Sequence, residues 1–515
     1  MELNYTQRLM IRSLAVLTVL RWIMAGLHEL TPAEAQLLEV LRHPALVGIN
    51  GGHLPAWFAG VGTVFFSDTA FGVRFMAPVL AAGASWMLYR LARSLTGEKT
   101  AGWTVALFNL TPMVNLAAIQ MRPETPGLFL LVGGMVAVWR AVRRASPWDW
   151  HWPLAGLLFG AGFLCWYGAG LGMLGTLLLL LLPRRWRGLL RRPGPWLMLA
   201  DFVLLLWPLW DWNHDNAWAG YYQWRDRIFP TGSSLQWMAP VELSGQWLAL
   251  VSPVILAAMG WALCKAVREG PRTDAARFIT AFALPSLAAS LIFSLTAGAR
   301  ASWLAPALPA LCLALPWAWE NHLTNLPLKN HLQWLCVLPA LILTPIALDT
   351  DLLRHAGVPL TYQRDHSRTW RAWSTTAREA ADVIAEALPQ APGGLFILAE
   401  DERLASILNF HLPASLPVLR PTVRHPTVQI PASAVPESDY HFWPGYASTS
   451  GGKNAYAGRT ALYFTTSSAI NPPPRLRTTF RDIGPLTIFD TMQFGLPLRR
   501  VKVFVCHGYQ PEYPN

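Results

Sequence analysis

Side chains suited to acid–base chemistry gather in one long loop near the N-terminus, residues 28–69. Glu34 and Glu39 lie in segment 33–42, where leucines at helical spacing predict a short helix. His43 and His53 follow, and a glycine-rich turn precedes His53. A carboxylate placed in this way could take a proton from a hydroxyl group. Loop acids are commonly just solvated, and we favour that for Glu39 and His43. Glu34 and His53 are the better functional candidates.

A second short loop, residues 120–126, reads Gln-Met-Arg-Pro-Glu-Thr-Pro and carries Arg122 and Glu124. Glu124 stands at the start of an apolar run, where an acid also complements the helix dipole. The sequence leaves cap and catalytic carboxylate equally open for it. Glu34, His53 and Glu124 could bind a divalent cation, although their spacing is not diagnostic of a metal site. The five cysteines show no metal-ligand spacing.

The elements that position these loops are apolar runs long enough to cross a bilayer. The chain is 53% hydrophobic and 14% charged, whereas soluble proteins carry about 25% charged residues. We predict a polytopic α-helical membrane protein with about eleven spans. They begin near Leu9, Phe71, Ala101, Thr125, Trp152, Gly168, Trp196, Trp247, Phe278, Trp303 and Leu332, and the last ends near Leu348. We expect the first to be an uncleaved signal anchor.

The formal net charge is +11, and its distribution predicts the topology. Arginines and lysines follow the second, fourth, sixth and eighth spans, which places them on one side, and the loops opposite carry most acids. Positive loops mark the cytoplasmic side. The N-terminus is therefore expected inside and the C-terminus outside. The same pattern argues against nucleic-acid binding, which needs a basic folded surface.

The composition changes at about Asp349, where charged residues, Pro, Ser and Thr become more frequent. Two helical patterns and four short strand patterns alternate there, which is typical of a small α/β domain. The helices are expected at 371–388 and 401–412, and the strands at 394–399, 461–465, 486–489 and 501–505. We therefore predict a membrane domain, 1–348, and an extracytoplasmic α/β domain, 349–515.

The order of these pieces resembles the GT-C superfamily of glycosyltransferases over nearly the whole chain. The resemblance is nearest to the branch of protein O-mannosyltransferases and bacterial lipid A aminoarabinose transferase. Residues 30–35 are similar to its Asp-Glu-Ala loop motif, 52–57 to its His-Pro-Pro turn and 123–126 to its second acidic loop. The family's catalytic aspartate falls on Ala33 here. A lysine often found at the end of a middle span falls on Trp166.

This resemblance implies a membrane glycosyltransferase at the outer face of the bacterial inner membrane. It would move a sugar from a polyprenyl-phosphate donor to a hydroxyl or phosphate of a lipid or glycan acceptor. Glu34 is the first candidate for the base and Glu124 the second. The residues expected to bind the substrate and its phosphate are His53, Arg122, Tyr167, Arg225, Arg227 and Arg300.

Two other functions remain open. The alanine at position 33 favours a catalytically inactive relative that binds polyprenyl-linked glycans or scaffolds an envelope assembly. A transporter would bury charged groups at mid-membrane and often show repeated halves. Here the acids cluster at one face and no repeat is visible, with Asp201 in the seventh span as the main exception.

Overall fold

The computed structural model describes residues 5–511 except 145, 147, 183, 231–234, 271, 324, 359, 363–364, 421–426, 449–453 and 494. The chain divides into two compact units. The first comprises Met1–Ala25, Leu46–Ser67 and Phe71–Leu352. The second comprises Gly26–Ala45, Asp68–Ala70 and Leu353–Asn515. The second unit therefore combines the first part of the first long loop with the C-terminal part of the chain.

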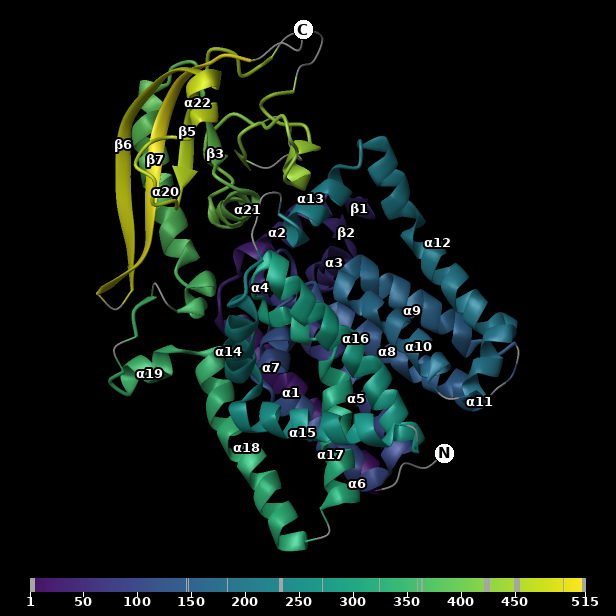
Figure 1. Cartoon of the computed structure of the whole chain (residues 1–515). Coiled ribbons are helices and arrows are strands. Elements are labelled where there is room, and N and C mark those ends of the chain that lie inside the picture. The colour runs from purple at the N-terminus through teal and green to yellow at the C-terminus, as the bar shows by residue number, and fades with distance from the viewer. Residues whose placement is uncertain are drawn as a thin grey trace. The chain divides into compact units, whose positions relative to one another are not determined.

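The first unit is a bundle of helices (Figure 1). Among the described residues, six helices are long and apolar enough to cross a bilayer by themselves. They are α1 (Tyr5–Leu27), α4 with α5 (Ala70–Arg74 and Met76–Thr96), α8 (Glu124–Arg144), α12 (Pro193–Asp215), α16 (Asp274–Ala297) and α18 (Leu326–Leu348). The shorter helices include α3 (Leu54–Phe66), α9 (His151–Cys165), η1 (Tyr167–Gly170), α10 (Leu171–Leu181), α11 (Arg184–Arg187), η2 (Gly188–Arg191), α13 (Ala219–Ile228), η3 (Ala301–Leu304) and α17 (Leu308–His322).

Two further spans would each be a bent pair of helices. The pairs are α6 with α7 (Glu98–Leu110 and Pro112–Ile119), bent by 68°, and α14 with α15 (Ala239–Val251 and Pro253–Glu269), bent by 110°. Each second helix starts with a proline, which lacks the N–H needed to continue the preceding helix. Ser252, at the second break, has a φ of 84°. All eleven predicted segments are helical, but length and composition support six to eight crossings, so eleven stays a prediction.

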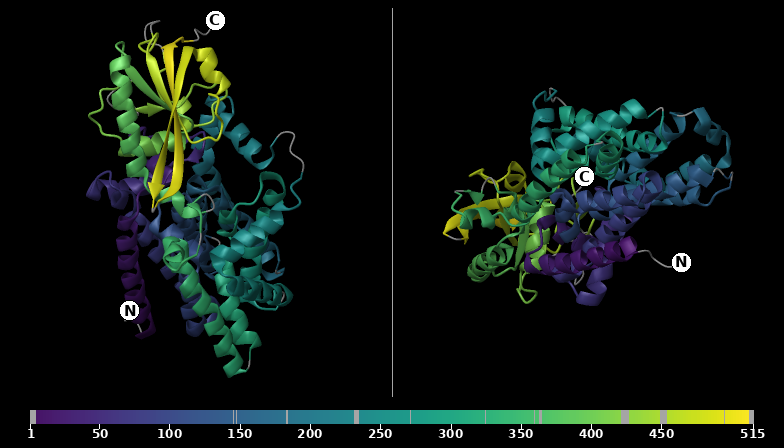
Figure 2. Two further views of the ribbon diagram at one scale, coloured as in Figure 1. Left: turned by 90° about the vertical axis from the view of Figure 1, so that its left-hand side faces the viewer. Right: turned by 90° about the horizontal axis from the view of Figure 1, so that it is seen from below.

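Burial separates the centre of the first unit from its periphery. In α8, 83% of the apolar window is buried, against 22% in α1, 17% in α12 and 22% in α18. The last three lie on the outside of the bundle (Figures 1 and 2) and expose large apolar side chains. An apolar exterior of this kind suits contact with lipid.

The second unit is built on one mixed sheet with the strand order β4-β3-β5-β7-β6. The strands are β3 (Leu395–Ala399), β4 (Val428–Gln429), β5 (Thr460–Thr465), β6 (Phe480–Gln493) and β7 (Leu496–Tyr509). β3 is parallel to β4 and β5, whereas β5–β7 and β6–β7 are antiparallel. The four expected strands lie where the sequence predicted them, but two extend much further as the long hairpin β6–β7 (Figure 2).

Helices α20 (Trp373–Ala387) and α21 (Glu402–His411) accompany the sheet, and α22 (Pro474–Thr479) precedes β6. α21 contacts β3 and β4, and α20 contacts β6. The first-loop helix α2 (Pro32–Arg42) packs against α21. A helix near the N-terminus is thus part of the same compact unit as the C-terminal sheet.

Candidate functional site

Glu34 caps its own helix. The Thr31 hydroxyl accepts a hydrogen bond from the Glu34 N–H at 3.2 Å, and the Thr31 N–H donates to Glu34 Oε2 at 2.9 Å. Thr31 Oγ1 also donates to Oε2, at 3.0 Å. This reciprocal pair is a capping box, which satisfies N–H groups that the first helical turn leaves unpaired. Glu34 is fully buried, so at least one of its carboxylate oxygens is already engaged in structure.

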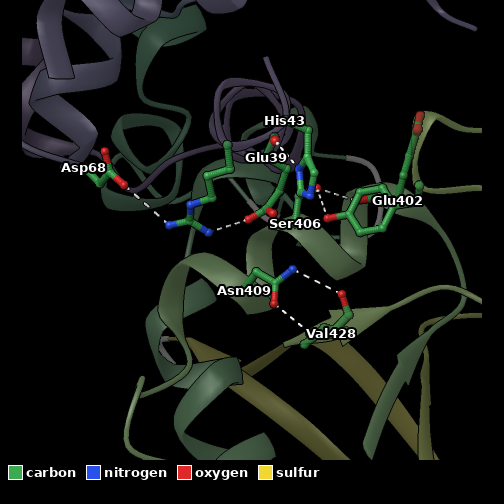
Figure 3. A network of polar contacts seen from close by, with 9 residues as sticks. Glu39, His43, Asp68, Glu402, Ser406, Asn409 and Val428 are labelled. Carbon is green, nitrogen blue, oxygen red and sulfur yellow. Dashed lines mark hydrogen bonds and ion pairs between the residues drawn. The ribbon is translucent and has the colours of Figure 1, made fainter. Parts of the chain in front are cut away.

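Glu39, on the same helix, is buried against α21 (Figure 3). Its Oε1 accepts a hydrogen bond from Arg42 at 2.7 Å, and Arg42 also reaches Asp68 at 3.4 Å. Burial outweighs the attraction of Arg42 and raises the pKa of Glu39 to about 7. The ring of His43 stacks on Trp443 at 4.0 Å between centroids. Both residues, which the sequence left as solvated loop groups, thus have packing roles.

Glu29 fastens the start of the first loop to helix α20. It accepts hydrogen bonds from the N–H of Trp373 at 2.5 Å and from the N–H and hydroxyl of Ser374. A carboxylate at this end of a helix meets unpaired N–H groups and the positive end of the helix dipole. The guanidinium of Arg499 lies over the Trp373 ring at 3.3 Å. Sequence reasoning assigned no role to Glu29, because 344 residues separate the partners and no local pattern signals the contact.

In the first unit, the candidate residues gather around a two-stranded hairpin, β1 (Val47–Gly48) with β2 (Gly51–Gly52). Gly51 has a φ of +113°, and a Cβ there would lie 2.6 Å from the Tyr167 hydroxyl. A Cβ on Gly52 would lie 2.1 Å from the Leu164 carbonyl oxygen. The hairpin therefore packs directly on the end of α9 and on η1, and only glycine permits this approach.

The hairpin also meets α13. Arg227 donates a hydrogen bond to Asn50 Oδ1 at 3.0 Å. Asn213 Oδ1 accepts from the N–H of Tyr221 at 2.9 Å, which holds the turn between α12 and α13. His53 follows β2 directly, is buried, and its N–H donates to the Leu46 carbonyl at 2.9 Å. Three of the predicted substrate-binding residues, His53, Tyr167 and Arg227, are thus brought to one hairpin.

Glu124 begins α8, the most buried of the long helices. The Thr125 hydroxyl donates to the Ala117 carbonyl at 2.7 Å and ties this end of α8 to α7. Arg122 Nε lies 3.6 Å from Glu124 Oε2, and the Glu124 side chain is 17% exposed. In the part of the chain that the structure describes, this buried Oε2 accepts no hydrogen bond. Glu124 is therefore a largely buried carboxylate with an unused acceptor beside a half-exposed cation.

The start of α8 and the hairpin contact the same segment. Gly127, one turn after Glu124, packs on Trp166, since a Cβ there would lie 3.1 Å from Trp166 Cβ. Trp166 is followed by Tyr167, which in turn contacts Gly51. A continuous series of contacts therefore joins Glu124, the segment 166–167 and the hairpin within one unit.

The other two predicted phosphate ligands have local partners. Arg225 pairs with Asp226 at 2.7 Å and lies over the Tyr222 ring at 4.9 Å. Arg300 precedes η3 and lies over the Trp303 ring at 5.9 Å. Across the described residues there is no group of three or more His, Cys, Asp or Glu side chains that could hold a metal ion. The cation site suggested for Glu34, His53 and Glu124 therefore gains no support.

The helical bundle, with its six to eight candidate spans among the described residues, is that of a polytopic membrane protein. The family described as dolichyl-phosphate-mannose-protein mannosyltransferase matches residues 50–212. The crystal structure of ArnT from Cupriavidus metallidurans bound to undecaprenyl phosphate has the same fold, with a TM-score of 0.56 at 14% identity over 96% of this chain and 97% of ArnT.

Similarity in sequence extends to two kinds of named transferase. The lipid A galacturonosyltransferase RgtD of Rhizobium johnstonii is 25% identical over 49% of this chain and 52% of RgtD. An undecaprenyl phosphate-alpha-4-amino-4-deoxy-L-arabinose arabinosyl transferase of Pseudomonas aeruginosa is 27% identical over 50% of this chain and 48% of that protein. The chain thus spans about half the length of the curated relatives it matches. The resemblance to the GT-C superfamily, in its lipid A aminoarabinose transferase-like branch, is confirmed.

Proposed function

We propose that this protein is a membrane glycosyltransferase that moves a sugar from a polyprenyl-phosphate donor to a lipid or glycan acceptor at the outer face of the bacterial inner membrane. The observation that carries the proposal is Glu124, a largely buried carboxylate whose Oε2 accepts no hydrogen bond among the described residues and lies 3.6 Å from Arg122. The relatives are named for transfer to lipid A or for an undecaprenyl-phosphate sugar, and these names support the proposed substrate class.

The reaction asks for a base and for cations. Glu124 takes the proton of an acceptor hydroxyl, whose oxygen forms a bond to the anomeric carbon of the sugar. The bond from that carbon to the phosphate oxygen breaks, and polyprenyl phosphate leaves with one more negative charge than it carried in the donor. A phosphate acceptor is already an anion and needs no base. Arginine suits the leaving phosphate because its planar fork donates two parallel hydrogen bonds.

Arg122 and Arg227 are the cations we assign to the donor phosphate. Arg122 is half exposed beside Glu124, and Arg227 is held at the hairpin by Asn50. Tyr167 and His53 then border the sugar. Arg225 and Arg300 stay candidates for the outer part of the donor, where each already stacks on an aromatic ring.

A catalytically inactive relative that binds lipid-linked glycans is the second candidate function. Two observations favour it: Ala33 stands where the family has its aspartate, and Glu34 Oε2 is engaged by Thr31. Such a protein would bind polyprenyl phosphate through the same arginines without consuming the donor.

Transfer by the full-length protein in liposomes separates the two functions. Undecaprenyl-phosphate-linked aminoarabinose or galacturonic acid serves as donor and lipid A as acceptor, with Glu124→Gln and Glu34→Gln as variants. Glu242→Gln, at an exposed glutamate in the first turn of α14, is the matched control. For transfer to a hydroxyl acceptor, we expect Glu124→Gln to lower kcat by roughly 10²- to 10⁴-fold with no change in the control. Wild-type turnover by Glu124→Gln would remove Glu124 as the base, and donor binding without turnover by the wild type would favour the inactive relative.

The membrane topology is part of the same proposal. We propose a membrane domain over 1–348 with eleven crossings and an extracytoplasmic domain over 349–515. Because eleven is an odd number, the N-terminus then lies in the cytoplasm and the C-terminus outside. Single cysteines near each terminus, labelled with an impermeant thiol reagent on whole cells, test this arrangement. Labelling of both termini from the same side would refute it.

A further inference from the structure

A cavity of about 750 Å³ lies at the far end of α8 from Glu124, between the ends of α5 and α8 and the beginning of α1. Glu124 starts this helix, and the lining runs from Val136 to Arg144 at its end, so the cavity begins about 18 Å along the helix from Glu124 and ends about 30 Å from it. Five arginines line the cavity, Arg90 and Arg93 from α5 and Arg140, Arg143 and Arg144 from α8. The glycosyltransferase reaction assigns none of them a role.

The charge in this cavity is only partly balanced. Arg93 pairs with Glu98 at 2.6 Å, and Arg144 lies 3.9 Å from Asp149. Arg90 and Arg140 have no hydrogen bond or ion pair among the described residues, and Arg140 lies within electrostatic reach of Arg90 and Arg144. Like charges facing one another across a cavity are unfavourable unless an anion lies between them. Five arginines and two carboxylates leave an excess of positive charge that calls for more than one negative group.

The residues that line the cavity also include an apolar and aromatic group beside the arginines. Trp86 stands one turn before Arg90 on α5, and Val136 stands one turn before Arg140 on α8, so each pair shares a helix face. Trp139 lies beside them, with the Arg143 guanidinium 5.7 Å from the centre of its ring. On both helices, therefore, an apolar or aromatic lining residue stands one turn further from the helix end than an arginine, so the lining has an apolar part and a cationic part. A soluble anion would leave the apolar part unfilled, whereas an amphipathic anion fills both.

We propose that this cavity binds an anionic phospholipid with two phosphates, of the diphosphatidylglycerol type, in the leaflet on the arginine-rich side. The guanidinium groups of α5 and α8 hold the phosphates, and the first part of the acyl chains lies along Trp86 and Val136. Arginines that only set membrane topology need to lie near the surface. They have no need to line one cavity from two helices, and that arrangement favours a ligand.

Lipid binding to the full-length protein in detergent, followed by native mass spectrometry, tests the proposal. The probes are tetraoleoyl diphosphatidylglycerol, dioleoyl phosphatidylglycerol and inorganic pyrophosphate. We expect the diphosphatidyl lipid to bind most tightly. The pair Arg90→Gln with Arg140→Gln should weaken its binding at least about tenfold. The pair Arg90→Lys with Arg140→Lys, which keeps both charges, should retain most of the affinity and shows that changes at these positions leave the protein folded.

The matched control removes two arginines from the same predicted membrane side outside the cavity, Arg268→Gln with Arg272→Gln. It should bind the lipid as the wild type does. Equal loss in this control would reduce the effect to general surface charge and overturn the site. Unchanged binding by the Arg90/Arg140 glutamine pair would overturn it too. Pyrophosphate binding as tightly as the lipid would identify a soluble phosphate as the ligand and refute the lipid.

Discussion

Replacing Gly51 by alanine tests whether the hairpin positions Tyr167. Gly51 has a φ of +113°, where a side chain strains the backbone, and its Cβ would lie 2.6 Å from the Tyr167 hydroxyl oxygen and 3.0 Å from Cζ. Gly97 offers the matched control, since its φ is +101° and no atom lies within 4 Å of an added Cβ. Both substitutions carry backbone strain of about 1–3 kcal/mol, but only Gly51→Ala must also displace the phenol ring.

The difference between the two variants isolates that displacement. Moving a side chain about 30° off its rotamer costs about 0.5–1.5 kcal/mol, so Gly51→Ala should be less stable than Gly97→Ala by about 1 kcal/mol. Thermal unfolding in detergent measures both. Adding Tyr167→Ala should remove the extra loss, which makes the two positions non-additive in a double-mutant cycle.

Donor binding should follow the same pattern. Under the proposed function, Gly51→Ala weakens binding of the polyprenyl-phosphate sugar, whereas Gly97→Ala leaves it unchanged. If the two glycine variants lose equal stability, or if Tyr167→Ala adds its own loss on top of that of Gly51→Ala, the hairpin does not bear on Tyr167 and the reasoning fails.

Two further predictions concern the second unit. The pKa of Glu39, raised by burial from 4.5 to about 7, means that the folded state holds a proton which the unfolded chain has lost between those values. The free energy of unfolding therefore falls as the pH rises through this window, by up to about 3 kcal/mol. The Glu39→Gln variant should have the melting temperature of the wild type near pH 5 and a higher melting temperature than the wild type near pH 8. If the melting temperatures of the two proteins changed with pH in parallel, this prediction would be contradicted. Glu29→Ala should lose about 1–2 kcal/mol of helix capping, seen as faster hydrogen exchange at the start of α20 with β5 unchanged. Equal exchange in the two proteins would show that Glu29 is not the cap.

Local features of the first loop could be predicted from the sequence. Segment 33–42 forms α2 almost as expected, because Thr31, Pro32 and Glu34 supply cap, first-turn proline and capping box. The glycine-rich turn before His53 became the β1–β2 hairpin. In each case the responsible interactions lie within a few residues.

The long-range contacts could not be predicted. Glu29 meets Trp373, Asn50 meets Arg227 across 177 residues, and α2 packs on α21. Such pairs depend on how whole helices pack, and a single sequence carries no record of that. The burial of Glu39 has the same origin: its helix looks half-solvated until α21 covers it.

Under the proposed function, the hydrogen bonds between Thr31 and Glu34 Oε2 help to decide which carboxylate is the base. In α2, Pro32 is the first helical residue, so Ala33 is the second and Glu34 the third. A capping box requires the third position, where the side chain turns back to the N-cap N–H, and Glu34 Oε2 does so. An acid at the second position points about 100° away around the helix, so Glu34 cannot both cap α2 and replace the aspartate absent at position 33. Glu34→Gln, which keeps an acceptor for Thr31, should therefore retain most activity and stability, whereas Thr31→Ala should lose about 1 kcal/mol of stability. If Glu34→Gln abolished transfer without changing the melting temperature, Glu34 would be the base, and the capping geometry would describe a resting state only.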